Sequence, residues 1–582
     1  MKIMLTSINS KYIHTNLAIR YLYQNLKQLN EEVIFREYTI NQHFDDLLKN
    51  IYEEQPDVIG FSCYIWNISL IHQIGRELKK VLPETRIILG GPEVGFDTGK
   101  IMEKQDYIDI IVKGEGETTL YELLKRMKEN ESYHDMSNIA FRVRGKVIEN
   151  TSKPSNTFHD HAPFPYEGLS TDSNKIYYYE SARGCPYNCE YCLSSTISGV
   201  SFLPMEKIQR DLDFFIKNKV KQVKFVDRTF NAKKNHALGV MNYIMKNHNG
   251  FTNFHFEITA ELIDEDFIEF LKTAPEGLFQ FEVGVQSTNP ETLSAINRNM
   301  DFSKIKAPLK ALVNLKNIHV HLDLIAGLPY EDYFTFRKSF NEVFSLGAEK
   351  LQLGFLKLLK GSELRNKAEG YGYVYTDGAP YEILENLWIN YTEILKLKDV
   401  EDLLEKYWND RGFPRTLDYV INTLYKANAF KFFDDFSRYW KERGFYEQSQ
   451  SKESLYVIVL EFCQSQDFDE ILFIQNLLRL DYLKENQKRK IPKGLEVKSS
   501  EEKSQVWSKE EAHEFLQSIE NKKQYLPHAV EISAKKLIKK VHFEVFEYPI
   551  TKVLEDELLT LSEPKDSVIL FDYEYDQAYL IK

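Results

Sequence analysis

The stretch Ser181-Ala-Arg-Gly-Cys-Pro-Tyr-Asn-Cys-Glu-Tyr-Cys192 places three cysteines within eight residues of a 582-residue chain. Cys185, Cys189 and Cys192 have the spacing C-x3-C-x2-C, and Tyr191 stands directly before the last of them. Three thiolates this close together can bind three irons of a [4Fe–4S] cube and leave the fourth iron without a protein ligand. A structural zinc site usually takes four ligands, and no fourth Cys or His lies within a few residues.

This motif resembles the signature of radical S-adenosylmethionine (SAM) enzymes. The resemblance implies that the open iron chelates SAM through its amino and carboxylate groups. It also implies that one electron from the cluster cleaves SAM to methionine and a 5′-deoxyadenosyl radical. The chain has 5 cysteines, and the remaining two, Cys63 and Cys463, are far apart, so we expect no second protein-bound cubane.

The composition is that of a globular protein with two to four domains, with 43% hydrophobic and 28% charged residues. A net charge of −13 argues against broad nucleic-acid binding, because no global positive field would attract phosphates. We find neither a signal-peptide core nor an apolar run of membrane-spanning length. We therefore expect a cytoplasmic protein without a membrane partner, as a monomer or homodimer.

Residues 1–150 alternate strand-like apolar runs with amphipathic helical runs. Such alternation predicts a doubly wound parallel sheet, which binds ligands beyond the carboxyl ends of its strands. One predicted strand ends in Leu-Gly-Gly-Pro92, and the next ends in Lys-Gly-Glu-Gly-Glu117. This arrangement resembles the Rossmann-like cobalamin-binding domain that precedes many radical SAM domains. A Rossmann-like domain with vestigial binding is the alternative.

By that resemblance, cobalamin lies against the loops 7–16, 62–67 and 90–95. The implied cobalamin-binding residues are Ser7, Tyr12, Ser62, Tyr64, Trp66, Gly90, Gly91, Pro92 and Glu117. The D-x-H-x-x-G motif of the methionine-synthase type is absent. We therefore expect base-off cobalamin with no histidine ligand from that motif.

Residues 151–174 contain three prolines and read as a linker. In residues 175–375 six further strands are predicted, with polar or glycine residues at their ends. Six strands are the number expected for the partial (β/α)6 barrel of radical SAM enzymes, in which active sites form at the strand ends. The complete fold expected is α/β, with a mainly helical α+β domain over residues 376–582.

Two strand-end segments also resemble cobalamin-dependent radical SAM proteins, namely Phe281-Glu-Val-Gly-Val-Gln-Ser287 and Asp323-Leu-Ile-Ala-Gly-Leu-Pro-Tyr-Glu331. The resemblance assigns the amino-acid end of SAM to Glu282, Gln286 and Arg298, and the ribose to Asp323. Carboxylates accept from ammonium and hydroxyl groups, and arginine pairs with a carboxylate. Tyr191 and Asp227 complete the SAM-binding set. A helix cap or a barrel salt bridge is the alternative for each residue.

The leading hypothesis is a cobalamin-dependent radical SAM enzyme that methylates an unactivated carbon through methylcobalamin. One alternative keeps both cofactors for a rearrangement, oxidation or cyclisation without methyl transfer. A different class of alternative is a tetrapyrrole carrier or chaperone with a vestigial radical site. We expect a small-molecule substrate and an electron donor such as flavodoxin or ferredoxin. The C-terminal domain resembles one without an assigned function, and no catalytic side chain is singled out.

Overall fold

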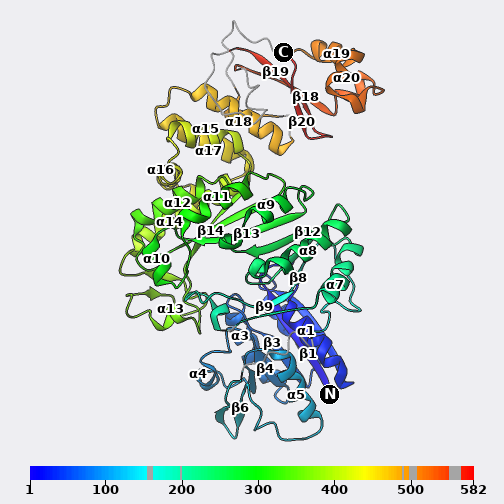
Figure 1. Cartoon of the computed structure of the whole chain (residues 1–582), viewed down its shortest axis with the longest axis vertical. Coiled ribbons are helices and arrows are strands. Elements are labelled where there is room, and N and C mark those ends of the chain that lie inside the picture. The colour runs from blue at the N-terminus through cyan, green and yellow to red at the C-terminus, as the bar shows by residue number, and fades with distance from the viewer. Residues whose placement is uncertain (154–161, 197–198, 488–489, 497–506, 549–564) are drawn as a thin grey trace. The chain divides into compact units, whose positions relative to one another are not determined.

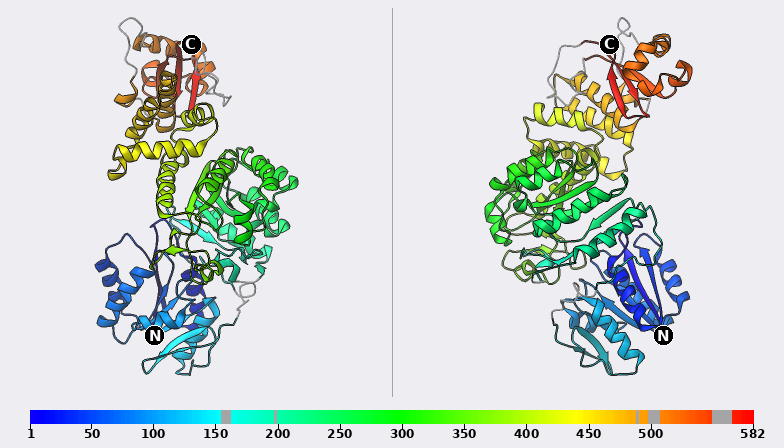
Figure 2. Two further views of the ribbon diagram at one scale, coloured as in Figure 1. Left: turned by 90° about the vertical axis from the view of Figure 1, so that its left-hand side faces the viewer. Right: turned by 45° about the vertical axis from the view of Figure 1, so that its right-hand side comes forward.

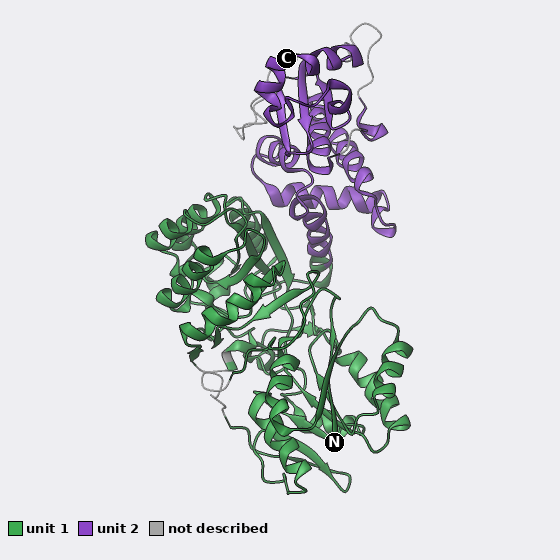
Figure 3. Cartoon of the chain, turned by 90° about the vertical axis from the view of Figure 1, so that its right-hand side faces the viewer, with its two compact units in different colours: residues 1–394 green, residues 395–582 purple. Residues whose placement is uncertain are grey.

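The structure is a computed structural model of the whole chain. It describes residues 1–153, 162–196, 199–487, 490–496, 507–548 and 565–582. The chain divides into two compact units, residues 1–394 and residues 395–582, and each is considered by itself (Figure 3). Part of the predicted linker, residues 154–161, lies outside the described residues.

The first sheet of the larger unit has seven strands in the order β2-β1-β3-β4-β5-β6-β7 (Figure 1). Strands β1 to β5 are parallel, which confirms the predicted doubly wound sheet, and β6 and β7 extend it in antiparallel fashion. The strands are β1 (Lys2–Asn9), β2 (Glu32–Thr39), β3 (Val58–Ser62), β4 (Arg86–Gly90), β5 (Ile110–Val112), β6 (Ile139–Val143) and β7 (Lys146–Glu149).

Helices cover both faces of this sheet (Figure 2). One core lies under α1 (Leu17–Leu26) and α5 (Gly116–Lys128), and includes Ile19 and Leu123. The other core contains residues of α2 (Phe44–Glu54), α3 (Ile68–Val81) and α4 (Thr98–Lys104). Because the central strands are buried on both faces, they read as continuous apolar runs rather than as alternating ones.

The strand order reverses direction at β1, which lies between β2 and β3. In sheets of this type the connections on either side of such a point diverge, and the crevice between them binds the ligand. The carboxyl ends of β1 and β3 carry the predicted cofactor residues Ser7 and Ser62. The fold therefore places the first two predicted cobalamin loops at its topological switch point.

The second sheet is a six-stranded parallel sheet in the order β15-β14-β13-β12-β11-β8, which confirms the predicted partial barrel (Figure 1). One face of these strands is apolar and buried, and includes Phe254, Phe256 and Phe281. The strands are β8 (Ile176–Tyr179), β11 (Gln222–Phe225), β12 (Asn253–Ile258), β13 (Phe279–Gln286), β14 (His319–Ala326) and β15 (Lys350–Phe355). The long helices between them are α7 (Met205–Lys217), α8 (Lys234–Asn247), α11 (Phe302–Val313) and α12 (Tyr333–Phe344).

The edge of the barrel at β8 is continued by the loop that follows β1. The backbone N–H of Ile176 donates to the carbonyl of Ile13 at 2.7 Å, and the N–H of Thr15 donates to the carbonyl of Ile176 at 3.3 Å. Tyr166, from the predicted linker, is buried beside this contact, and its hydroxyl donates to the carbonyl of Tyr178 at 2.7 Å. The two sheets are thus joined by backbone hydrogen bonds within one compact unit.

The smaller unit is mainly helical and ends in an antiparallel sheet, β18-β19-β20, as predicted for an α+β domain. Its main elements are α15 (Pro414–Tyr419), α16 (Ala429–Glu442), α17 (Lys452–Ser465), α18 (Ile471–Asn486), α19 (Lys509–Gln517), α20 (Ile519–Tyr525), β18 (Val541–Phe546), β19 (Ser567–Asp572) and β20 (Gln577–Leu580). Among the described residues of the whole chain, none of the helices combines the length and the apolar character needed to cross a membrane.

Candidate functional site

The three cysteines lie in a loop at the start of the barrel. β9 (Ala182–Gly184) ends directly before Cys185, and the short helix η2 (Leu193–Thr196) begins directly after Cys192. None of the three forms a disulfide, and Cys189 is buried whereas Cys185 and Cys192 are partly exposed. In the described part of the chain, no three Cys, His, Asp or Glu side chains gather as they would around one metal ion. A [4Fe–4S] cube does not require that, because each thiolate binds a different iron.

Polar groups lie beside two of the sulfur atoms. The Thr229 hydroxyl, which donates to the carbonyl of Arg228, is 3.4 Å from the sulfur of Cys185, and the backbone N–H of Ser194 donates to the sulfur of Cys192 at 3.4 Å. The thiolate is the form of cysteine that binds metal. The residues of the loop therefore fit an iron–sulfur cluster with one iron left open.

Asp227, predicted to bind SAM, holds the chain just before the cysteine loop. Both of its oxygens accept hydrogen bonds from Ser181, one from the backbone N–H at 2.7 Å and one from the hydroxyl. His236 Nε2 is 2.9 Å from the same hydroxyl. Burial raises the pKa of Asp227 to about 7, and burial lowers the pKa of His236 to about 4. The N-cap position of the next helix belongs to Thr229, so Asp227 is not a helix cap. Its contact with SAM stays a prediction.

Arg298 reaches the cysteine loop from the chain that follows β13. Its Nη1 lies 3.9 Å from the sulfur of Cys189 and 3.4 Å from the hydroxyl of Tyr191, and its Nη2 donates to the carbonyl of Gly284. Its Nε is buried and has no hydrogen-bond partner among the described residues. Burial raises the pKa of Cys189, and Arg298 acts in the opposite direction. The structure therefore places Arg298 beside both Tyr191 and Cys189, two residues that the sequence assigns to the SAM site and to the cluster.

Two further predicted SAM residues carry buried oxygens without partners. These are Oε1 of Gln286 and Oδ1 of Asp323, considered among the described residues. Gln286 lies at a bulge of β13 with φ of 69°, a conformation that costs free energy in a residue other than glycine. Burial, followed by the charges of Glu282 and Glu257, raises the pKa of Asp323 well above its usual range. Buried acceptors of this kind can accept a hydrogen bond from a ligand hydroxyl or ammonium group.

The carboxylate of Glu282 has ion-pair partners within the protein. It lies 3.0 Å from Lys224 Nζ and 3.1 Å from His255 Nε2. Burial alone would raise the pKa of Glu282, but the neighbouring His255 and the charge of Lys224 lower it to about 2. These contacts match the barrel salt bridge that is the alternative to SAM binding at this position.

Glu261 is a candidate that the sequence reasoning did not include. It follows β12, and its carboxylate accepts a hydrogen bond from the hydroxyl of Thr259. Burial would lower the pKa of Arg298, but the negative groups around it, among them Glu261, raise it. Glu261 is thus an acidic group close to the cysteine loop, and its position at a strand end was the only signal in the sequence.

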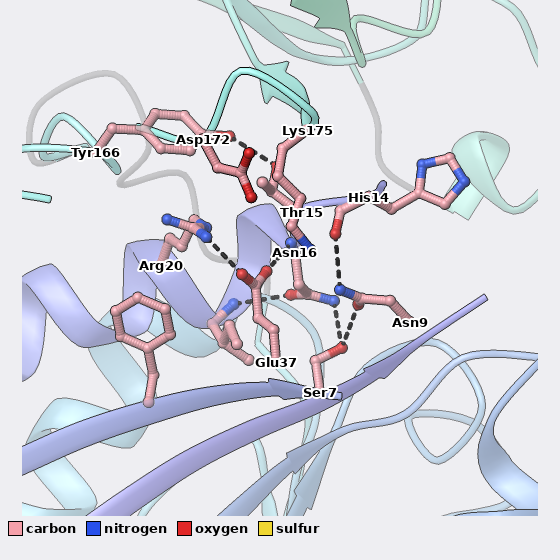
Figure 4. Close-up of polar contacts among 12 residues, drawn as sticks. Ser7, Asn9, His14, Thr15, Asn16, Arg20, Glu37, Tyr166, Asp172 and Lys175 are labelled. Atoms are coloured by element: carbon pink, nitrogen blue, oxygen red, sulfur yellow. Dashed lines mark hydrogen bonds and ion pairs between the residues drawn. The ribbon is translucent and has the colours of Figure 1, made fainter. Parts of the chain in front are cut away.

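The first cofactor loop is organised around Ser7, as Figure 4 shows. The side-chain amide of Asn16 donates to the Ser7 hydroxyl at 2.8 Å, and that hydroxyl donates to Asn9 at 2.9 Å. Tyr12 is 62% exposed, and Lys175 lies over its ring at 3.6 Å. Ser7 is therefore buried within a polar network, whereas Tyr12 packs against the start of the barrel domain.

The other two loops predicted to bind cobalamin, residues 62–67 and 90–95, differ in what they present: aromatic rings in the first and a glycine in close backbone contact in the second. The rings of Tyr64 and Trp66 stack at 4.5 Å and 5°, and Trp66 is 43% exposed, so a flat apolar surface is open at the end of β3. Gly91 has φ of +108°, and a Cβ on it would lie 2.5 Å from the carbonyl oxygen of Cys63. Only glycine fits there. Ser62, Gly90 and Pro92 lie at the same edge, where β3 and β4 end, so the residues present there are compatible with the predicted cobalamin site.

Glu117 is the predicted cobalamin residue whose surroundings differ most from the expectation. Its carboxylate accepts a hydrogen bond from Arg183 at 2.9 Å, and Arg183 precedes the first cluster cysteine by two residues. The structure thus brings the two halves of the larger unit together at a contact that sequence reasoning did not anticipate.

Three family models match successive parts of this chain. The B12 binding domain matches residues 4–124, and the Radical SAM superfamily matches residues 179–343. A protein family of unknown function, DUF4080, matches residues 369–571.

Two curated relatives also match part of this chain. The chain is 26% identical to 2-(S-pantetheinyl)-carbapenam-3-carboxylate methyltransferase of Streptantibioticus cattleyicolor, over 64% of this chain and 57% of that protein. It is 27% identical to the cobalamin-dependent radical SAM methyltransferase TokK of Streptomyces tokunonensis, over 56% of this chain and 52% of TokK. The chain thus spans about half the length of these relatives.

The structure of the cobalamin-dependent S-adenosylmethionine radical enzyme OxsB, with aqua-cobalamin and S-adenosylmethionine bound, has the same fold. It aligns with a TM-score of 0.59 at 16% identity, covering 85% of this chain and 82% of OxsB. The chain is therefore a B12-binding-domain radical SAM protein with a C-terminal DUF4080 domain of unknown function.

Proposed function

We propose that this protein is a cobalamin-dependent radical SAM methyltransferase that acts on an unactivated carbon of a small molecule. The observation that carries the proposal is the surroundings of the cysteine loop. Three closely spaced cysteines lie there, and Arg298 is 3.9 Å from the sulfur of Cys189. Among the described residues, Arg298 Nε and the buried oxygens of Gln286 and Asp323 have no hydrogen-bond partner. The names of two curated relatives, both methyltransferases, support the reaction class.

When bound, the cluster supplies the electron that cleaves SAM, and cobalamin supplies the methyl group. The protein's own residues bind and orient the reactants. Arg298 suits the carboxylate of SAM, because its buried Nε–H has no partner among the described residues and a charge-assisted hydrogen bond to a carboxylate is a strong one. Asp323 suits the ribose hydroxyls, because its free Oδ1 accepts a hydrogen bond. For the ammonium group of SAM we propose Glu261. Glu282 is less suited, because it already lies within ion-pair distance of Lys224 and His255.

The cobalamin site belongs to the edge formed by Ser7, Ser62, Gly90 and Gly91, with Tyr64 and Trp66 as its flat surface. We propose that cobalamin is held base-off, since the D-x-H-x-x-G motif is absent. The physiological electron donor is proposed to be a flavodoxin or ferredoxin.

The test is an analysis of SAM products from the anaerobically reconstituted protein. With a strong one-electron reductant, the proposal predicts 5′-deoxyadenosine and, once a substrate is supplied, S-adenosylhomocysteine in addition. Formation of 5′-deoxyadenosine without S-adenosylhomocysteine on a converted substrate would show radical chemistry without methyl transfer. Absence of both products from protein with a full cluster would favour a carrier.

A further inference from the structure

Arg183 ties the cysteine loop to the cobalamin-type sheet. Its Nε and Nη2 donate to Glu180, at the end of β8, at 3.0 and 2.8 Å. Its Nη2 also donates to Glu117 at 2.9 Å, and its Nη1 lies 3.3 Å from Glu115. Glu115 and Glu117 flank the first residue of α5 in the other domain. One guanidinium thus joins carboxylates of the barrel to carboxylates of the cobalamin-type domain.

The contact is largely withdrawn from solvent. The side chains of Arg183, Glu180 and Glu115 are 15%, 13% and 16% exposed. Burial acts to lower the pKa of Arg183, but the charges of Glu117 and Glu180 outweigh it and raise the pKa. Only arginine presents five donors in a rigid plane, so lysine cannot hold three carboxylates in the same way. The N-terminus of α5 adds favourable electrostatics for its two glutamates.

The link from Arg183 to the first cluster ligand is short and stiff. Gly184 separates Arg183 from Cys185, has φ of +101°, and a Cβ on it would lie 2.1 Å from the carbonyl oxygen of Gly199. β9 pairs with β10 (Val200–Phe202), and Ser181, on the other side, is fixed by Asp227. A displacement of the guanidinium is therefore transmitted to the cysteine loop rather than absorbed between them.

We propose that Arg183 is a positioning residue that sets the separation between the cluster and cobalamin, by clamping the cysteine loop onto the start of α5. Glu117 then acts through this clamp and not as a cobalamin contact. The inference rests on the proposed function, because it assumes that both cofactors are bound. Such a separation matters, since a displacement of about 1 Å can cost on the order of a hundredfold in rate.

The clamp itself is tested on the cofactor-free chain by hydrogen exchange of Arg183→Gln. Loss of charge-assisted hydrogen bonds should speed exchange about tenfold or more in residues 182–192 and 114–119 together. The matched control is Arg126→Gln, because Arg126 is also an arginine paired with two carboxylates, Glu122 at 3.0 Å and Asp135 at 2.7 Å, but lies wholly within α5 and its own domain. Unchanged exchange in Arg183→Gln, or a change in one segment only, would overturn the clamp.

The distance is tested on the loaded protein by pulsed electron paramagnetic resonance between the reduced cluster and cob(II)alamin. The wild-type chain and Arg126→Gln should give one narrow distance, and Arg183→Gln should retain both cofactors with a broadened or shifted distance. Arg183→Lys should not restore it. Glu117→Gln is the milder variant should Arg183→Gln fail to fold. A wild-type distance in these variants would overturn the role of Arg183, whereas loss of cobalamin by the wild-type chain would instead overturn the proposed function.

Discussion

Replacement of Arg298 by methionine should weaken SAM binding while leaving the cluster in place. The guanidinium has five N–H donors, and the structure commits Nη2 to the carbonyl of Gly284 and Nη1 to Tyr191 and Cys189. Nε is buried without a partner and remains for a ligand carboxylate. A hydrogen bond to a charged group contributes about 1.5–3 kcal/mol. Its loss corresponds to a dissociation constant raised by roughly 10–150-fold.

The assay is a titration of the reduced cluster with SAM, followed by the change in its electron paramagnetic resonance spectrum. Iron content and the melting temperature show whether the cluster and fold persist, because Gly284 also loses a partner in Arg298→Met. Arg298→Lys keeps the charge without the planar fork and should lie between wild type and Arg298→Met. The control is Arg337→Met on α12, where the guanidinium lies over the ring of Phe334 at 5.8 Å. SAM affinity within about twofold of wild type in Arg298→Met, with a full cluster, would refute the assignment.

Three further predictions concern the cluster, the cofactor edge and the buried carboxyl. Cys185→Ser should abolish the retention of a [4Fe–4S] cluster at an unchanged far-ultraviolet circular dichroism spectrum, as measured by iron analysis; a full iron complement would contradict this. Gly91→Ala should destabilise the larger unit by about 1–3 kcal/mol in urea unfolding and release cobalamin, since the new methyl group meets the carbonyl of Cys63; Gly95→Ala, where the nearest atom is 3.4 Å away, is the control. Asp227 has a folded-state pKa of about 7, above its unfolded value, so its contribution is fully present below about pH 4 and is lost as pH rises through about 7. The free energy of unfolding of the wild-type protein should therefore fall by up to about 4 kcal/mol between about pH 4 and pH 7. That of Asp227→Asn should fall by less. Equal losses in urea unfolding would contradict the assignment.

The elements that sequence reasoning predicted well are those whose signal is local. The apolar residues between Leu17 and Leu26 recur at helical spacing and predict a helix, and α1 has these bounds, with Asn16 as its N-cap. The apolar pattern of residues 417–433 also predicts a continuous helix, but there the structure is broken. Lys426 and Ala427 adopt positive φ, and the side chain of Asn428 caps α16 by accepting from the N–H of Lys431. An apolar pattern that continues across the break conceals it.

The residues of the candidate site likewise fall into those with a local sequence signal and those whose contacts depend on distant parts of the chain. The cysteine spacing lies within one loop and could be recognised directly, and the strand ends that carry Gln286 and Asp323 follow from the alternation of strands and helices. The pair Arg183–Glu117 joins residues 66 positions apart in two domains. No local pattern encodes how the two sheets dock, so the contact between Arg183 and Glu117 could not be predicted from the sequence. The engagement of Glu282 by Lys224 and His255 likewise depends on the pairing of three strands.

The central claim is that one chain holds both cofactors. The most direct measurement is anaerobic reconstitution with iron, sulfide and hydroxocobalamin, followed by desalting, an absorption spectrum, and iron and cobalt counts. The account predicts about four irons and one base-off cobalamin per chain. A full cluster without retained cobalamin would contradict it, and would leave a radical SAM protein whose N-terminal domain serves another purpose.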